Sequence, residues 1–201
     1  MRGLAVGLVT LLMLGSAAKA ADDMSVLTAG EIAPERFGWD GAYVGVAAGY
    51  GWLKDIDYAF TPPLRSSGED FIFGGHVGYL HAWNNFVVGA EAEALNLDIQ
   101  FEGLPVWVAQ AYTAKARFGY AFDRLLVTGH LGGTWINTTS TIPLYDGLAD
   151  WALTYGAAVD YAVTGNVLIG ASYSHYTADG YDGTLIDADV DALTLRLGYK
   201  F

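Results

Sequence analysis

Alternation of apolar and polar residues, with a period of two, is the dominant pattern of the chain from residue 39 onward. The last stretch shows it most clearly: one face carries Leu193, Leu195, Leu197, Tyr199 and Phe201, and the other carries Thr194, Arg196, Gly198 and Lys200. Successive side chains of a β-strand point to opposite faces, so this pattern predicts a strand with one apolar side. An ordinary edge strand is the alternative for this stretch taken alone.

Seven further stretches alternate in the same way. The eight predicted strands cover residues 42–52, 71–79, 86–95, 112–122, 125–135, 153–163, 167–176 and 189–201. Short connections (82–85, 123–124 and 164–166) alternate with long ones (54–70, 98–106, 137–150 and 177–188). Periplasmic turns and extracellular loops differ in length in this way. We therefore predict an all-β fold, an eight-stranded antiparallel up-and-down transmembrane β-barrel of the outer-membrane type.

Charged residues in the middle of the predicted strands share the face opposite to the apolar one. The inward ionisable residues are His76, Glu91, Glu93, Lys115, Arg117, His130, Asp160 and Arg196. A Lys or Arg that faces mid-bilayer lipid costs about 2–4 kcal/mol, which explains the segregation. Without the histidines, three acids meet three bases at one level of a lumen just wide enough for side chains. This predicts a self-neutralised ion-pair network that plugs the lumen, with a conducting or gated pore as the alternative.

Aromatic residues gather at both ends of the predicted strands. Tyr79, Trp83, Phe86, Tyr120, Phe122, Tyr161, Tyr199 and Phe201 lie by the short turns, and Trp52, Phe71, Trp107, Trp135 and Trp151 lie by the long loops. Aromatic girdles mark the two membrane interfaces of transmembrane barrels.

The first twenty residues are typical of a secretory signal peptide. Arg2 precedes an apolar run from Leu4 to Leu14, and residues 18–20 form a small-x-small cleavage site. Residues 21–38 are polar and show neither the strand period of two nor the helical period of about 3.6 residues. We therefore interpret them as a periplasmic lead before a barrel of residues 39–201.

The mature chain would then carry eight basic and 22 acidic residues, a net charge of −14. Nucleic acid is therefore not an expected partner, because it binds clustered Lys and Arg.

Acidic residues dominate the predicted loop end, where we expect a solvated rim beside lipopolysaccharide. Asp187, Asp189 and Asp191 share one face and are candidate oxygen ligands of a divalent cation, but their spacing matches no calcium-loop motif. The chain has no cysteine and no zinc or phosphate-loop motif, so we expect no cofactor, metal or disulfide.

Haem capture is a candidate function, because Tyr and His ligate haem iron. Its candidate ligands in or near the loops are Tyr58, Tyr145, His175, Tyr176 and Tyr181.

Catalysis is not expected. Ser174 and His175 are adjacent, but neighbouring residues of a strand point to opposite faces and form no nucleophile–base pair. An acyltransferase barrel would need an apolar pocket at the level where Glu91, Glu93 and Arg117 are predicted. We therefore predict that the protein is not an enzyme.

Two motifs resemble a known family. The opening Trp39-Asp40-Gly41-Ala42-Tyr43-Val44-Gly45 and the ending Leu197-Gly198-Tyr199-Lys200-Phe201 are similar to those of the outer-membrane immunogenic, porin-like small barrels of alphaproteobacteria. The resemblance implies an abundant surface protein, with porin and haem-binding members among its relatives. The last strand also resembles the C-terminal signal that the barrel-assembly machinery reads. We expect a monomeric structural surface protein of the Gram-negative outer membrane, with a narrow porin or a haem-binding protein as alternatives.

Overall fold

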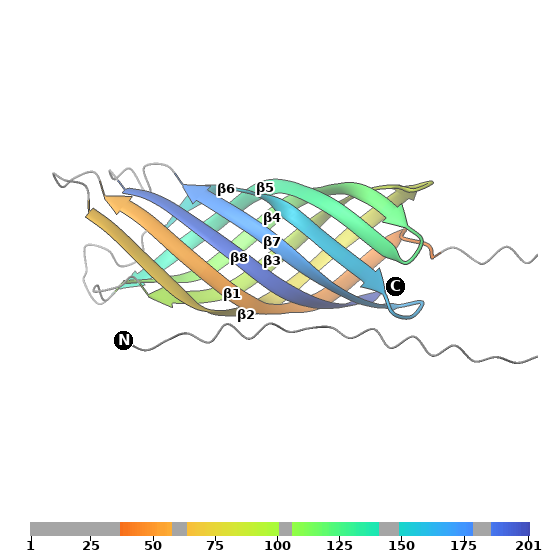
Figure 1. Ribbon diagram of the computed structural model, residues 1–201, viewed down its shortest axis with the longest axis horizontal. Coiled ribbons are helices and arrows are strands. Elements are labelled where there is room, and N and C mark those ends of the chain that lie inside the picture. The colour runs from red at the N-terminus through yellow and green to blue at the C-terminus, as the bar shows by residue number, and fades with distance from the viewer. Residues whose placement is uncertain (1–36, 58–63, 101–105, 141–148, 179–185) are drawn as a thin grey trace, which may run out of the picture. The chain divides into compact units, whose positions relative to one another are not determined.

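Eight antiparallel strands form a closed barrel in the computed structural model, which describes residues 37–57, 64–100, 106–140, 149–178 and 186–201 (Figure 1). They are β1 (Gly41–Asp57), β2 (Leu64–Trp83), β3 (Phe86–Gln100), β4 (Val106–Phe122), β5 (Leu125–Ser140), β6 (Ala149–Ala162), β7 (Val167–Ala178) and β8 (Ile186–Lys200). Each strand pairs with its neighbours in sequence, so the predicted fold class is confirmed. Among the described residues, no helix is long and apolar enough to cross a membrane.

The first and last strands close the barrel. Val44 of β1 lies opposite Val77 of β2 on one side and opposite Tyr199 of β8 on the other. The amide of Phe201 donates a hydrogen bond to the carbonyl oxygen of Ala42 at 2.9 Å. Closure gives every strand a hydrogen-bonded neighbour on each side, which a strand surrounded by lipid requires.

Short turns join the strands at one end of the barrel, as predicted. Asn84 and Asp123 have φ values of 56° and 55°, respectively, in the β2–β3 and β4–β5 turns. Asn and Asp adopt this left-handed conformation more readily than other non-glycine residues, which suits them to tight hairpins.

The strands extend further toward the long loops than predicted. β1 continues to Asp57 instead of ending at Trp52, β2 begins at Leu64, and β8 begins at Ile186. Parts of the predicted loops 54–70, 98–106, 137–150 and 177–188 are therefore strand, and those loop boundaries were wrong. In and directly beside these extensions, Leu53, Leu97 and Val190 are buried, whereas Lys54 and Asp189 are exposed. The period of two persists, but the apolar face now points inward.

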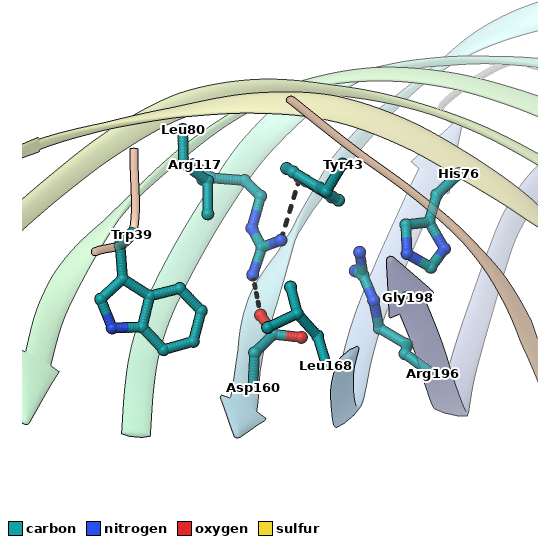
Figure 2. Close-up of a pocket in the computed structure, with 9 residues that line it drawn as sticks. All are labelled: Trp39, Tyr43, His76, Leu80, Arg117, Asp160, Leu168, Arg196 and Gly198. Atoms are coloured by element: carbon teal, nitrogen blue, oxygen red, sulfur yellow. Dashed lines mark hydrogen bonds and ion pairs between the residues drawn. The ribbon is translucent and has the colours of Figure 1, made fainter. Parts of the chain in front are cut away.

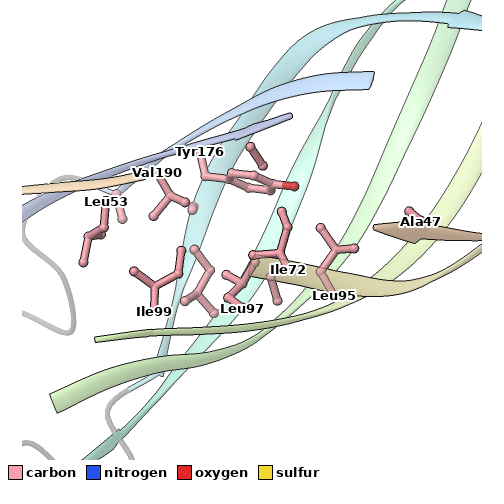
Figure 3. Packing of buried hydrophobic residues seen from close by; sticks show 13 residues of the cluster. Ala47, Leu53, Ile72, Leu95, Leu97, Ile99, Tyr176 and Val190 are labelled. Carbon is pink, nitrogen blue, oxygen red and sulfur yellow. The ribbon is translucent and has the colours of Figure 1, made fainter. Parts of the chain in front are cut away.

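The interior consequently has two apolar clusters. The cluster at the short-turn end contains Trp39, Tyr43, Leu80, Val87, Ala121, Leu126, Ala162 and Leu168. The cluster toward the long loops is built around Leu53, Ile72, Leu95, Leu97, Ile99, Tyr176 and Val190 (Figure 3). The second cluster resembles the core of a soluble barrel, where apolar side chains fill the lumen. Buried polar residues occupy inward positions between the two sets.

Candidate functional site: the ionic layer of the lumen

Cross-strand register brings the inward ionisable residues to one level. Glu91 of β3 lies opposite Lys115 of β4, and Arg117 of β4 lies opposite His130 of β5. His76 of β2 lies opposite Glu93 of β3. Asp160 and Arg196 both lie opposite Gly170 of β7, on its two sides. All eight residues selected from the sequence are inward and at most 6% exposed.

Glu91 is the centre of this layer. Its Oε1 accepts from Arg196 Nη1 at 3.0 Å and lies 3.1 Å from the ammonium of Lys115. Its Oε2 accepts from Arg117 Nη1 at 3.0 Å and from the hydroxyl of Tyr43 at 2.6 Å. Arg196 Nη2 also donates to Oε2. One buried carboxylate therefore contacts three cations and one hydroxyl.

The other two carboxylates complete the charge balance. Asp160 Oδ2 accepts from Arg117 Nη2 at 2.5 Å, and Glu93 Oε1 lies 3.2 Å from Lys115 Nζ. Figure 2 shows Arg117 between Tyr43 and Asp160. Burial of a charge is costly unless it is paired and hydrogen-bonded, and here each base has at least one carboxylate partner.

The two histidines lie beside the ion pairs without joining them. His130 Nε2 and Ser174 Oγ are 3.1 Å apart. The His76 ring lies 6.0 Å from the Tyr43 ring, centre to centre. Both residues are buried, and His130 Nδ1 has no hydrogen-bond partner among the described residues.

Several hydroxyl groups also belong to the layer, although the predicted network contained only ionisable residues. Thr113 and Thr134 share a hydrogen bond of 2.8 Å, Thr134 also bonds Thr154, and Arg117 donates to Thr128 at 2.9 Å. Tyr43 bonds Glu91 from β1. The alternation predicts the inward position of these residues, but it does not predict their hydrogen bonds to the charged groups or to one another.

Trp39 closes the short-turn side of the layer. It precedes β1 and is only 2% exposed, and its Nε1 donates to the carbonyl of Asp123 at 2.8 Å. The amide of Phe37 donates to the Asp123 carboxylate at 3.1 Å. Strand order places the β4–β5 turn, which contains Asp123, across the barrel from β1. The residues before β1 therefore cross the mouth of the lumen.

The outer surface separates apolar and polar side chains as predicted for the last strand. Leu193, Leu195, Leu197, Tyr199 and Phe201, the predicted assembly signal, are all exposed on the outside of the barrel. Leu195 is 72% exposed, and its neighbour Arg196 is 5% exposed. The assignment of Arg196 to the lumen thus agrees with the exposure of the residues beside it.

Two candidate haem ligands need correction or closer description. Tyr176 was placed near the surface loops, but its side chain is buried in the apolar cluster of the lumen. The alternation of inward and outward side chains in β7 continues beyond the membrane-facing part of the strand, so Tyr176 points inward like Ser172 and Ser174. His175 points outward and lies 2.8 Å from Asp191, with Nε2 3.7 Å from Asp189. Tyr58, Tyr145 and Tyr181 lie outside the described residues.

The described acidic side chains of β8 are Asp189 and Asp191. The Tyr173 hydroxyl donates a hydrogen bond to the Asp191 carboxylate at 2.6 Å. His175 Nδ1 lies 2.8 Å from the same carboxylate oxygen, so Asp191 already has two partners. The side chain of Asp187 lies outside the described part of the structure. Within that part, no group of three or more acidic or histidine side chains is arranged to hold a metal ion.

Comparisons with known proteins agree with this architecture. The family model of the outer membrane protein beta-barrel domain matches residues 7–201. The chain is 30% identical over 236 residues to the 31 kDa outer-membrane immunogenic protein of Brucella melitensis, covering 94% of this chain and 95% of the relative. It is 28% identical over 184 residues to the 25 kDa outer-membrane immunogenic protein of Brucella canis, covering 85% and 83%, respectively.

A solved structure shares the fold at lower identity. The attachment invasion locus protein Ail of Yersinia pestis has a TM-score of 0.51 and 18% identity, covering 81% of this chain and 99% of that one. This likeness concerns the barrel architecture alone.

Proposed function

Because the chain belongs to the outer membrane protein β-barrel domain family, we propose that it is a non-conducting structural barrel that displays its long-loop end at the cell surface. Its predicted location in the Gram-negative outer membrane is confirmed by the family and its relatives. Short turns lie on the periplasmic side of such barrels and long loops on the outside. The ionic layer then lies inside the membrane-spanning wall.

The contacts of Glu91 are the observation that carries this proposal. A carboxylate held by Lys115, Arg117 and Arg196 joins strands β3, β4 and β8 across the lumen. To pass a hydrated solute, the lumen would have to separate these pairs. Removal of one partner from a buried pair typically costs about 3–5 kcal/mol, because a charge is left uncompensated.

Apolar packing on both sides of the ionic layer supports a closed lumen. Trp39 and Leu168 are buried toward the periplasm, and Leu97, Ile99 and Tyr176 are buried toward the outside. A porin instead lines its channel with polar residues around water. Rearrangement of the ionic layer alone would therefore not open a pathway past the apolar clusters.

The ends of the strands toward the long loops, beyond the membrane-facing band, support surface display. They carry polar groups outward, including Lys54, Asp189 and Asp191, over an apolar interior. Such a wall is stable in water as well as in lipid, so it can hold loops above the bilayer. The relatives named immunogenic are outer-membrane proteins, and we propose the same exposure to the outside for this chain.

We further propose that lipopolysaccharide surrounds the barrel, that the barrel-assembly machinery inserts it, and that it acts as a monomer without enzymatic activity. The exposed aromatic end of β8 supports the assembly step. Haem binding stays an alternative without support from the described candidate ligands, because Tyr176 is buried and His175 pairs with Asp191.

A narrow porin is the main alternative, and liposome swelling separates the two functions. Vesicles containing the purified barrel should swell no faster than protein-free vesicles in isotonic solutions of small sugars or amino acids. A known porin, reconstituted at the same density, is the positive control. Swelling that scales with the amount of this protein would support the porin and contradict a closed lumen.

A further inference from the structure

A small cavity lies behind the indole of Trp39, between the ionic layer and the periplasmic mouth (Figure 2). Its volume is about 10 Å³, measured as the space open to the centre of a water molecule. In Figure 2, Arg117 and Asp160 lie on one side of this space, and Arg196 and His76 lie on the other. A volume of about 10–15 Å³ on this measure holds one water molecule.

Three polar atoms of the lining residues lack a hydrogen-bond partner among the described residues. They are His76 Nδ1, Arg117 Nε and Arg196 Nε. Each of these residues is at most 5% exposed, so bulk water does not supply the partner. Buried polar groups in native proteins are nearly always satisfied by protein or by ordered water. The three unpaired nitrogen atoms therefore call for a polar ligand in the same space.

Charge and size select the ligand. The carboxylates of Glu91, Glu93 and Asp160 already balance the cations of Lys115, Arg117 and Arg196, so an additional ion would leave the layer charged. A water molecule both accepts and donates, which suits guanidinium N–H donors and the Asp160 carboxylate. We infer that the cavity is a binding site for one buried water molecule and that Trp39 is the lid that separates it from the periplasm.

Gly198 lines the cavity, and its lack of a side chain leaves space for the water molecule. A Cβ at Gly198 would lie 3.5 Å from the Val44 oxygen, 3.7 Å from Leu168 Cβ and 3.9 Å from His76 Nε2, all ordinary contacts. At Gly49, by contrast, a Cβ would lie 1.9 Å from a backbone oxygen. Backbone clearance thus demands glycine at 49 but not at 198. A methyl group at 198 fits the fold and takes space that the water would use.

Trp39, which precedes β1, is held by contacts with the β4–β5 turn on the other side of the barrel. The indole Nε1 of Trp39 donates to Asp123, and the amide of Phe37 donates to the carboxylate of the same residue. Lys200 Nζ lies 5.7 Å from the centre of the Phe37 ring. The lid therefore spans from the β1–β8 side to the β4–β5 turn. A water behind it can exchange with the periplasm only when these contacts open.

Nuclear magnetic resonance of the full mature chain in nanodiscs tests the water site. Wild-type protein should show magnetisation transfer between a long-lived water and the Arg196 Nε proton. Gly198→Ala should lose this transfer while keeping the β circular-dichroism spectrum. Gly165→Ala is the matched control, because a Cβ there meets nothing within 4 Å, and it should retain the transfer. Absence of the transfer in wild type, or its persistence in Gly198→Ala, would overturn the site.

The lid is tested by the residence time of the same water, measured by deuteron relaxation dispersion. Trp39→Ala should abolish the slow-water dispersion, and Gly165→Ala should preserve it. If Trp39→Ala does not fold, Trp39→Phe retains a ring but lacks the indole donor and should shorten the residence time. An unchanged residence time in the variant that folds would contradict the lid. Conductance and swelling decide the closed lumen separately, so failure of the water site leaves the proposed function standing.

Discussion

Glu91 of β3 and Arg196 of β8 are joined across the lumen by two hydrogen bonds, although 105 residues separate them in the chain. β1 and β2 lie between these strands in the barrel wall. The contact therefore joins non-adjacent strands, and full satisfaction of the buried charges requires the last strand to be in place. Glu91 contacts three cations, whereas Glu93 contacts only one, Lys115, among the described residues, so the two carboxylates should contribute unequally to stability.

Glu91→Gln should lower the free energy of unfolding by about 3–5 kcal/mol, because three buried cations lose the charge of their shared partner. Glu93→Gln should cost less, because Lys115 keeps its contact with Glu91. Reversible urea unfolding in lipid vesicles measures both values. Equal losses, or a larger loss for Glu93→Gln, would contradict the central role of Glu91.

Leu195→Arg should destabilise the barrel by about 2–4 kcal/mol if the new charge stays at bilayer depth, because Leu195 faces lipid. Leu195→Ala removes the same side chain without adding a charge and is the matched control. The comparison is made by refolding into vesicles of one lipid composition. If the arginine variant refolded as well as the alanine variant, the outward assignment of Leu195 would be wrong.

Phe201→Ala should reduce insertion in cells and increase periplasmic proteolysis, while refolding in detergent stays intact. Phe201 is 70% exposed, and its backbone amide, which bonds Ala42, is preserved in this variant. Outer-membrane abundance and the heat-modifiable gel shift measure the two effects. A variant that inserts normally in cells would argue against a role of Phe201 in assembly.

Asp40, at the short-turn end of the barrel, should make a small pH-dependent contribution to the free energy of unfolding. The Ala82 amide, followed by His81, lowers the pKa of this exposed carboxyl below its usual 3.8. Stabilisation by a lowered pKa is present above the unfolded-state pKa and is lost as pH falls through the folded-state pKa. Wild type should therefore exceed Asp40→Asn by less than about 1 kcal/mol at neutral pH. This difference should vanish at pH below the folded-state pKa of Asp40, as measured by urea unfolding.

Strand parity in the membrane was predictable, because lipid imposes a large cost on misplaced charge. Arg117 and Arg196 could thus be assigned to the lumen from alternation alone. Leu97 and Ile99 were not recognised as strand residues, because beyond the bilayer water replaces lipid and the apolar side turns inward. Apolar and polar residues still alternate there, but the apolar side chains point into the lumen and the polar ones point outward.

Individual partners were less predictable than the level at which they meet. The pairing of Glu91 with Arg196 depends on the stagger between strands in the closed barrel, which alternation does not specify. Trp39 was assigned to the start of the barrel without a role, because it precedes the first strand and its indole enters the lumen from the end. Only the completed β4–β5 turn supplies its partner, Asp123.

Planar-bilayer conductance of the purified protein tests the closed lumen most directly. Wild type and a form with shortened long loops should both leave the bilayer at its baseline current, because the ionic layer and both apolar clusters lie within the barrel itself. A reproducible open level shared by wild type and the loop-shortened form would show a conducting lumen and contradict the account.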